Sequence, residues 1–142
     1  MKRICVLLYC LLFLSACASP RPPQTLYIQL GGLGMIENIA DAFVNEIEES
    51  EQLYPFFEHS SIDRFKEKFV EHICMMSNGP CKYTGDSMQD VHANMGINEA
   101  VFNNTVEALI DAMSTVGVSH RLQNKLLKRL APMRKDIIYV AR

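Results

Sequence analysis

The sequence has no long hydrophobic run, no zinc-type spacing of cysteines, no β-rich segment and no internal repeat. Its longest apolar-dominated stretch covers residues 4–16, which is too short for a mature membrane-spanning helix, because such a helix needs about 20 apolar residues. The five cysteines lack the paired spacings that hold zinc and therefore do not predict a zinc site. A chain of 142 residues is long enough for one domain.

The N-terminus has the features of an export signal. A basic start, Lys2-Arg3, precedes the apolar stretch, and Leu14-Ser15-Ala16-Cys17 ends it. This ending resembles a bacterial lipobox, in which the cysteine becomes the lipidated first residue of the mature chain. We therefore expect a lipoprotein signal peptide at residues 1–16, followed by a lipidated Cys17 and a proline-rich tether over residues 17–24. A plain signal peptide cleaved at the same place and an uncleaved anchor are the alternatives.

A lipid anchor at Cys17 predicts a location in the cell envelope, attached to a membrane and facing the periplasm. Ser19, in place of an aspartate, resembles lipoproteins that are sorted to the outer membrane. Removal of residues 1–16 leaves 12 basic and 16 acidic side chains, which is a formal charge of −4. No basic stripe is recognised in the folded part, so we expect no nucleic-acid partner.

Two cysteines, Cys74 and Cys81, remain in the mature chain besides Cys17. An exported compartment permits a disulfide between them, and residues 77–80, which lie between them, have the composition of a turn. Two free, partly buried thiols are the other reading, because sequence alone does not report the geometry that a disulfide needs.

Helical periodicity runs through most of the chain after residue 30 and predicts an all-α domain. The pattern from Gly34 to Ser50 places apolar residues at helical spacing, and Ser60 with Asp63 forms a capping box for the next helix. Asp86 is the expected N-cap of a short helix that ends at Gly96, and Asn98 is the expected N-cap of the next helix. The expected helices cover residues 34–50, 60–76, 86–96, 98–116 and a last one from about 119, which Pro132 should kink.

One histidine, His92, lies in an apolar setting. If its segment is helical, Met88, Val91 and Met95 share its face. A buried imidazole needs a hydrogen-bonding partner, a charged partner or a metal ion. Periodicity alone leaves these three readings open.

The order of several short motifs resembles the group 1 truncated haemoglobins over residues 26–140. The motifs are Gly31-Gly32, Pro55-Phe56-Phe57, Gly79-Pro80, Tyr83-Thr84-Gly85 and His92 with Gly96-Ile97. This resemblance implies a two-over-two helical sandwich around haem b, built by residues 25–142. It also implies that His92 is the proximal iron ligand. The residues that the resemblance places around the haem are Phe57, Phe65, Phe69, His72, Tyr83, Met88, Val91 and Phe102.

The distal side departs from the common pattern of that family. Val44 stands where many members have a tyrosine that hydrogen-bonds dioxygen, and Phe69 stands where a glutamine is common. With Phe65 one turn earlier, the expected distal pocket offers no hydrogen-bond donor, so we expect weak retention of dioxygen. His72 has three possible roles, as a sixth iron ligand, as a propionate partner or as packing at the pocket edge, and we expect the last.

Three functions follow from these observations. The first is binding of a diatomic gas (O2, NO or CO) at the haem iron of an envelope-anchored globin. The second is a redox enzyme, either an NO dioxygenase or a peroxidase-like protein, which would depend on an unknown reductase. The third is a haem-free globin-like lipoprotein that acts through protein contacts. Gas binding is the function we expect, and whether the protein is also an enzyme stays open at this level.

Overall fold

The computed structural model describes residues 24–139. The expected signal peptide, Cys17 and the tether up to residue 23 lie outside the described residues, as do residues 140–142. Over residues 24–139 the chain is helical and contains no strand, which confirms the predicted all-α class. None of the helices in this range has the length and apolar character that crossing a membrane requires.

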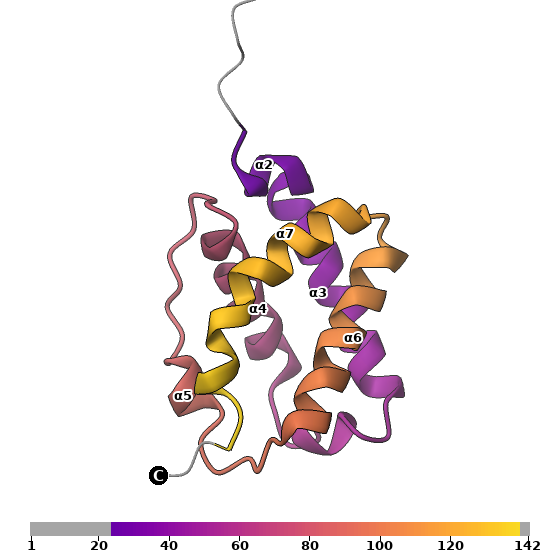
Figure 1. Ribbon diagram of the computed structural model, residues 1–142, viewed down its shortest axis with the longest axis vertical. Helices are drawn as coiled ribbons and strands as arrows, with labels where there is room; N and C mark the ends of the chain where they lie inside the picture. The colour runs from indigo at the N-terminus through magenta and orange to yellow at the C-terminus, as the bar shows by residue number, and fades with distance from the viewer. Residues whose placement is uncertain (1–23, 140–142) are drawn as a thin grey trace, which may run out of the picture.

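Six α-helices and two 3₁₀ segments make up the described part of the chain. In chain order they are α2 (Leu26–Leu30), α3 (Gly32–Glu49), η2 (Tyr54–Phe56), α4 (Ile62–Met76), α5 (Met88–Val91), α6 (Glu99–Thr115), α7 (His120–Leu130) and η3 (Ala131–Asp136). Helix α3 packs most extensively against α6 and α4, and α7 crosses in front of them in Figure 1. Pro132 lies in η3, so the expected interruption of the last helix is confirmed.

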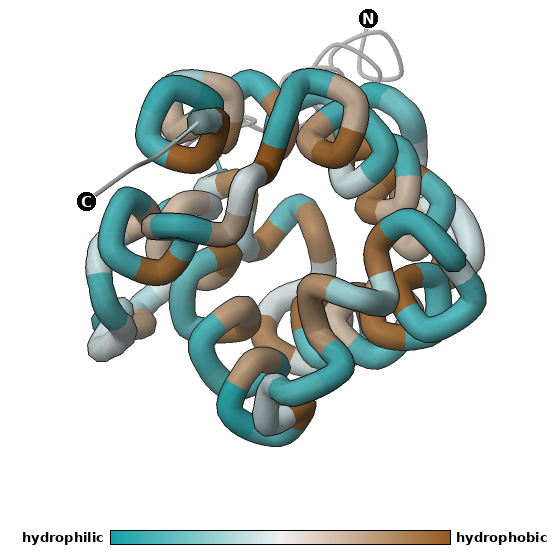
Figure 2. Tube along the Cα trace, turned by 90° about the horizontal axis from the view of Figure 1, so that it is seen from below, coloured by the Kyte–Doolittle hydropathy of each residue, from teal (hydrophilic) through white to brown (hydrophobic). Residues whose placement is uncertain are grey.

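Helix α3 supplies the centre of the core. Ile36, Ile39, Phe43 and Ile47 recur every three or four residues, and each is at most 4% exposed. They share one core cluster with residues of α4 and α6, among them Met113. Figure 2 shows hydrophobic and hydrophilic residues alternating around the helical turns, as expected of amphipathic helices.

Side chains cap the N-termini of α2, α4, α5 and α6, though not always the side chains that the sequence suggested. Asn98 caps α6 by accepting a hydrogen bond from the Val101 amide, as predicted. The prediction that Ser60 caps α4 is wrong, because Ser61 accepts from the Arg64 amide. Neighbouring serines are equivalent as caps in sequence, and the chain direction into the helix decides between them.

Two glycines make the junction between α2 and α3. Gly31 and Gly32 have φ angles of +115° and +77°, a region that L-residues with side chains rarely adopt. Gly31 ends α2 and also precedes the first residue of α3. The chain can therefore reverse between two helices without a loop.

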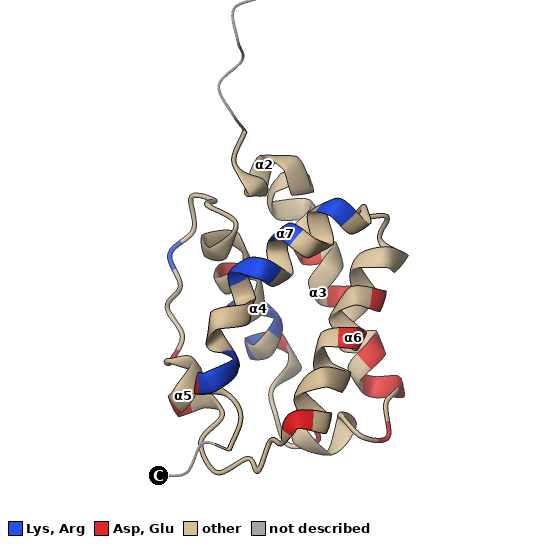
Figure 3. Cartoon of the chain, viewed as in Figure 1, with Lys and Arg blue, Asp and Glu red and all other residues tan. Residues whose placement is uncertain are grey.

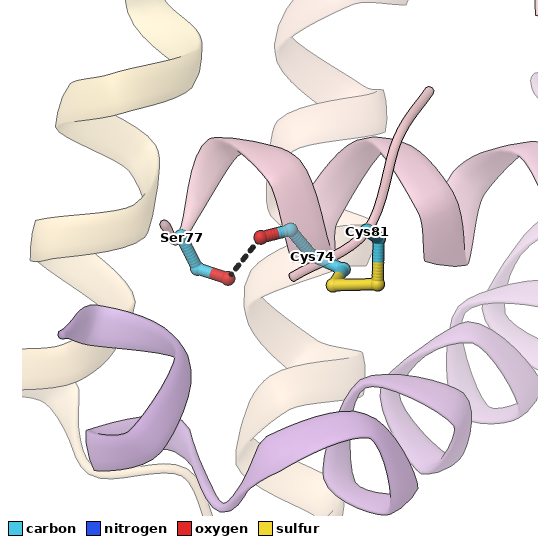
Figure 4. Close-up of a disulfide and its surroundings, with 3 residues drawn as sticks. All are labelled: Cys74, Ser77 and Cys81. Atoms are coloured by element: carbon cyan, nitrogen blue, oxygen red, sulfur yellow. Dashed lines mark hydrogen bonds between the residues drawn. A yellow bond between two sulfur atoms is a disulfide. The ribbon is translucent and has the colours of Figure 1, made fainter. Parts of the chain in front are cut away.

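A disulfide joins the end of α4 to the segment that leads toward α5. Cys74 and Cys81 have Cα atoms 5.7 Å apart, and Cys74 is fully buried (Figure 4). The turn between them passes close to the bond, since a Cβ on Gly79 would lie 2.6 Å from the Cys74 Sγ. The Ser77 hydroxyl donates to the Cys74 carbonyl at 3.0 Å and closes the helix end. Of the two readings of these cysteines, the disulfide is confirmed.

The disulfide should contribute measurably to stability. We expect Cys81→Ser to lower the free energy of unfolding by about 2.5 kcal/mol, the chain-entropy value for so short a closed loop. Urea unfolding followed by circular dichroism measures the change. The wild type in excess dithiol reductant is the matched control and should lose a similar amount. Equal midpoints for oxidised wild type, reduced wild type and variant would contradict the prediction.

Candidate functional site

The imidazole of His92 is oriented by a backbone carbonyl. Its Nδ1 lies 2.7 Å from the Met88 carbonyl oxygen, four residues earlier. A carbonyl oxygen only accepts hydrogen bonds, so Nδ1 carries the proton and donates it. The other ring nitrogen, Nε2, then keeps its lone pair, which is the form of the ring that binds a metal ion.

Burial keeps this imidazole neutral. Half-burial of His92 lowers the pKa of the ring, and the hydrogen bond to the Met88 carbonyl opposes that shift in part. The neutral ring is the state in which Nε2 acts as a ligand. Hydrogen bonding and burial therefore favour the same protonation state.

The segment that carries His92 is shorter than predicted. Helix α5 is a single turn, Met88–Val91, and His92 is its C-cap residue. The prediction that Asp86 caps this helix is wrong, because Ser87 caps α5 by accepting a hydrogen bond from the Asp90 amide at 3.1 Å. Ser87 also donates to the Asp90 carboxylate at 2.6 Å. Ser87 therefore holds the one turn from which the His92–Met88 bond is made.

Gly96 does not end this helix, which is a second correction. Helix α5 stops at Val91, and the chain then turns with Asn94 and Gly96 at φ angles of +63° and +67°. A glycine near the end of an apolar pattern predicts a left-handed residue correctly here. It does not report where the helical hydrogen bonds cease.

Four phenylalanine rings, from α3, from the residue that follows η2 and from α4, form a continuous cluster. The Phe43 and Phe69 ring centres are 5.2 Å apart, and those of Phe57 and Phe65 are 5.0 Å apart at an interplanar angle of 77°. Phe65 contacts Phe69 at 5.8 Å and joins the two pairs. Three of the four are predicted around the haem, and the fourth, Phe43, belongs to the buried core.

This cluster has the character expected of the distal side. Phe57, Phe65 and Phe69 are half-buried at the edge of the core, whereas Val44 is 7% exposed on α3. The side chains of Val44 and these three phenylalanines are hydrocarbons, so none of them can donate a hydrogen bond. Whether Val44 and Phe69 face a bound ligand stays a prediction.

His72 continues the same face of α4, one turn beyond Phe69. Its ring packs on that of Tyr83 with centroids 5.1 Å apart, and burial lowers the pKa of the imidazole. Burial also raises the pKa of the Tyr83 phenol, and the nearby Asp86 carboxylate adds to this shift. The phenol donates to the Asp86 carbonyl at 2.8 Å. His72 and Tyr83 thus form an aromatic pair between α4 and the segment before α5.

A polar clamp next to this pair was not anticipated from the sequence. The Glu71 carboxylate accepts from the Thr84 amide at 2.9 Å and from its hydroxyl at 2.8 Å. The Lys68 ammonium donates to the same hydroxyl at 2.7 Å. The bonds from Thr84 keep the pKa of Glu71 below its ordinary value. Because Glu71 and Thr84 are 13 residues apart, no local sequence signal could have paired them.

The remaining predicted residues are Met88 and Val91 on α5 and Phe102 on α6. Met88 is half-buried, and Val91 is 46% exposed. Phe102 is half-buried on α6, with the Arg134 guanidinium 5.4 Å from the centre of its ring. Their contact with a cofactor stays a prediction. His59 and His120 are exposed.

The chemistry of these side chains fits a haem group. His92 has one unprotonated ring nitrogen, which is the kind of donor that serves as an axial haem ligand, and half-buried aromatic and aliphatic side chains of the chain are suited to a flat apolar macrocycle. This donor set is that of an iron held in a ring that already supplies its other ligands. It differs from the three or four protein ligands of a bare metal site.

Comparison with known proteins agrees with this geometry. The pattern of the bacterial-like globin family matches residues 25–139. Group 1 truncated haemoglobin GlbN of Mycolicibacterium paratuberculosis is 31% identical over 115 residues, which cover 81% of this chain and 85% of the relative. Group 1 truncated haemoglobin of Tetrahymena pyriformis is 26% identical, with 82% and 96% covered.

Solved structures show the same likeness in three dimensions. The Fe(III) form of the Tetrahymena pyriformis truncated haemoglobin superposes with a TM-score of 0.78 at 25% identity, covering 81% of this chain and 98% of that one. The group II truncated haemoglobin of Bacillus anthracis reaches 0.75 at 21% identity, covering 86% and 96%, and speaks for the fold alone. The predicted truncated globin fold is confirmed. The chain therefore belongs to the bacterial-like globin family and is a haem-binding globin of the truncated type.

Proposed function

We propose that this globin binds a diatomic gas at a haem iron held by Nε2 of His92, with an apolar distal side formed by Val44, Phe65 and Phe69. The observation that carries the proposal is the hydrogen bond from His92 Nδ1 to the Met88 carbonyl. It sets the tautomer, and it also sets the direction in which Nε2 points. A core histidine that merely needed a partner would be satisfied by this one bond, but it would not need the surrounding half-buried apolar surface.

The roles of the other residues follow from their chemistry. When bound, haem supplies an iron that takes O2, NO or CO as a ligand. The side chains of Phe57, Phe65 and Phe69 cover apolar surface of the haem and exclude water from that surface. His72 and Tyr83 pack at the edge, where the aromatic pair closes the side of the pocket. The Glu71–Thr84 clamp holds the segment that leads to α5 and so keeps His92 in place.

The hydrocarbon distal side favours reversible gas binding over redox turnover. An NO dioxygenase needs dioxygen to be retained, and retention is strengthened by a donor that Val44, Phe65 and Phe69 cannot supply. Turnover would also need an external reductase. A haem-free role through protein contacts would leave the His92 tautomer and its apolar setting without a purpose.

The location that we propose is the periplasmic side of the cell envelope, with a lipid anchor at Cys17. Support comes from the sequence Leu14-Ser15-Ala16-Cys17 and from the globin match, which begins only at residue 25. Residues 17–24 then serve as a tether between the membrane and the globin. Ser19 favours the outer membrane.

Removal of the proposed ligand should change the optical spectrum. We expect His92→Gly, reconstituted with haem and reduced, to lose the wild-type Soret band, and added imidazole to restore it by filling the vacated position. His59→Gly is the matched control, because His59 is exposed, and it should leave the spectrum unchanged. His72→Gly should also leave the spectrum unchanged if His72 only packs at the edge of the pocket. A wild-type spectrum in His92→Gly without imidazole would sink the assignment.

Introducing a donor on the distal side should slow the loss of dioxygen. We expect Val44→Tyr to lower the dissociation rate about tenfold or more, since a hydrogen bond to a partly charged group is worth about 1.5–3 kcal/mol. Stopped-flow replacement of dioxygen by CO measures the rate. Val44→Phe serves as the control, because phenylalanine has nearly the volume of tyrosine but lacks its hydroxyl. Equal rates for the two variants would show that position 44 does not face the ligand.

Acylation at Cys17 is tested at the N-terminus itself. Mass spectrometry of protein from the membrane fraction should find residue 17 as the first residue, carrying a diacylglycerol thioether. The Cys17→Ser variant should lack this modification and leave the membrane fraction. An unmodified N-terminus at any other position would refute the anchor.

A further inference from the structure

The acidic and basic residues are distributed unequally along the described chain, because the segment after residue 117 is mostly basic. Residues 24–117 carry 15 acidic and 4 basic side chains, whereas residues 118–139 carry 6 basic side chains and 1 acidic one. Helix α7 itself, His120–Leu130, contains no acidic residue. The net charge of the mature chain therefore conceals a strongly basic segment, and the expectation that the folded part lacks a basic stripe is wrong for this helix.

Five of the six basic residues of α7 and η3 form one face of the molecule, which we call the α7 face, while the sixth, Arg134, is paired with Glu99 of α6. Its members are Arg121, Lys125, Lys128, Arg129 and Lys135. Figure 3 shows the basic residues along α7 and its continuation, while acidic residues gather on α3 and α6. Arg121, Lys128 and Lys135 are exposed.

The charges of the α7 face are not neutralised by the ion pairs that the structure shows between residues 24 and 139. None of these pairs includes a residue of α7. Lys125 donates to the Gln29 side chain and Arg129 to the Met76 carbonyl, both neutral acceptors. The apolar side of α7 is already used, since Leu126 is fully buried in the core. The face is therefore suited to electrostatic contact and not to insertion of the helix into a bilayer.

The α7 face adjoins the point where the tether enters the globin. Helix α2 packs on α7, and Lys125 Nζ lies 2.7 Å from the Gln29 Oε1 of α2. A chain of eight residues from Cys17 to Gln24 spans at most about 28 Å. Ile28 on α2 is 53% exposed and adds an apolar side chain at the same end.

We infer that the α7 face docks on the anionic phospholipid headgroups of the membrane that carries the Cys17 anchor. Basic side chains near such a surface are attracted within a Debye length, and a short tether makes even a weak contact effective by raising the local concentration. The acidic surfaces of α3 and α6 are repelled by the same headgroups, so the globin adopts one orientation on the membrane. The inference rests on the proposed anchor, but the contact itself is measurable without it.

Vesicle binding of the unacylated mature chain tests the contact directly. The protein is residues 17–142 with Cys17→Ser, loaded with haem, and the probe is vesicles of 30% phosphatidylglycerol in phosphatidylcholine. We expect binding in 50 mM NaCl, its loss in 500 mM NaCl, and no binding to pure phosphatidylcholine. Cosedimentation followed by the protein content of the pellet gives the partition coefficient, whether or not haem is bound.

Charge variants then locate the contact. Arg121→Gln/Lys128→Gln/Lys135→Gln should lower the partition coefficient at least tenfold, because each basic side chain near an anionic surface contributes about fivefold. The matched control removes three basic side chains elsewhere, Arg64→Gln/Lys66→Gln/Lys82→Gln, and should change it less than twofold. Equal effects of the two triple variants, or no binding by the parent protein, overturn the inference. Absence of binding by the parent protein would indicate an acidic protein as the partner of the α7 face.

A second measurement leaves every charge of the α7 face intact. In the same background, Asn124→Cys on α7 and Asp111→Cys on α6 each supply one free thiol for a fluorophore, since Cys74 and Cys81 are bonded and both substituted positions are exposed. Spin-labelled headgroups should quench the label at 124 and spare the one at 111. Equal or reversed quenching overturns the orientation. Failure of acylation or of haem binding would remove the proposed function but would leave both vesicle results unchanged.

Discussion

Burial of one face of α3 is the constraint on which the other helices depend. Ile36, Ile39 and Ile47 on this face are at most 1% exposed, and α4 and α6 pack on α3 from two sides. Phe43, on the same helix, then contacts rings from α4, so the aromatic cluster exists only because the core closes around α3. A domain of this size has little buried surface to spare, and the disulfide at the end of α4 adds a covalent constraint where the regular helices stop.

The position of His92 depends on contacts outside the regular helices. Helix α5 is one turn long and could not be stable alone, because isolated helices need many more residues. The disulfide, the His72–Tyr83 pair and the Glu71–Thr84 clamp all fasten the segment that precedes it to α4. His92, the proposed iron ligand, is thus held by a short segment that is fastened to α4, while the residues proposed for the distal side belong to the regular helices α3 and α4. Under this proposal, gas selectivity depends on Val44, Phe65 and Phe69, whose hydrocarbon side chains offer no hydrogen-bond donor.

The charge distribution connects the globin to its proposed surroundings. A formal charge of −4 for the mature chain predicts little affinity for an anionic surface. In the last two helical segments, however, all charged residues except one are basic. The α7 face lies beside α2, where the chain from the anchor arrives. A molecule arranged in this way would face the bilayer with α7 and leave its acidic helices toward the periplasm.

The sequence by itself determined the helical class, the N-cap at Asn98, the inward face of α3 and, through the order of its motifs, the globin family and His92 as the ligand to examine. Helical periodicity and caps are local properties, because they depend on residues within a few positions of each other, whereas the family assignment rests on the order of motifs along the chain. The tertiary structure decided which nitrogen of His92 is free, which serines cap α4 and α5, that Cys74 and Cys81 are joined, and that Glu71 holds Thr84. Each of these depends on the direction of the backbone, or on side chains from segments brought together only when the core closes. No spacing in the sequence reports such distances.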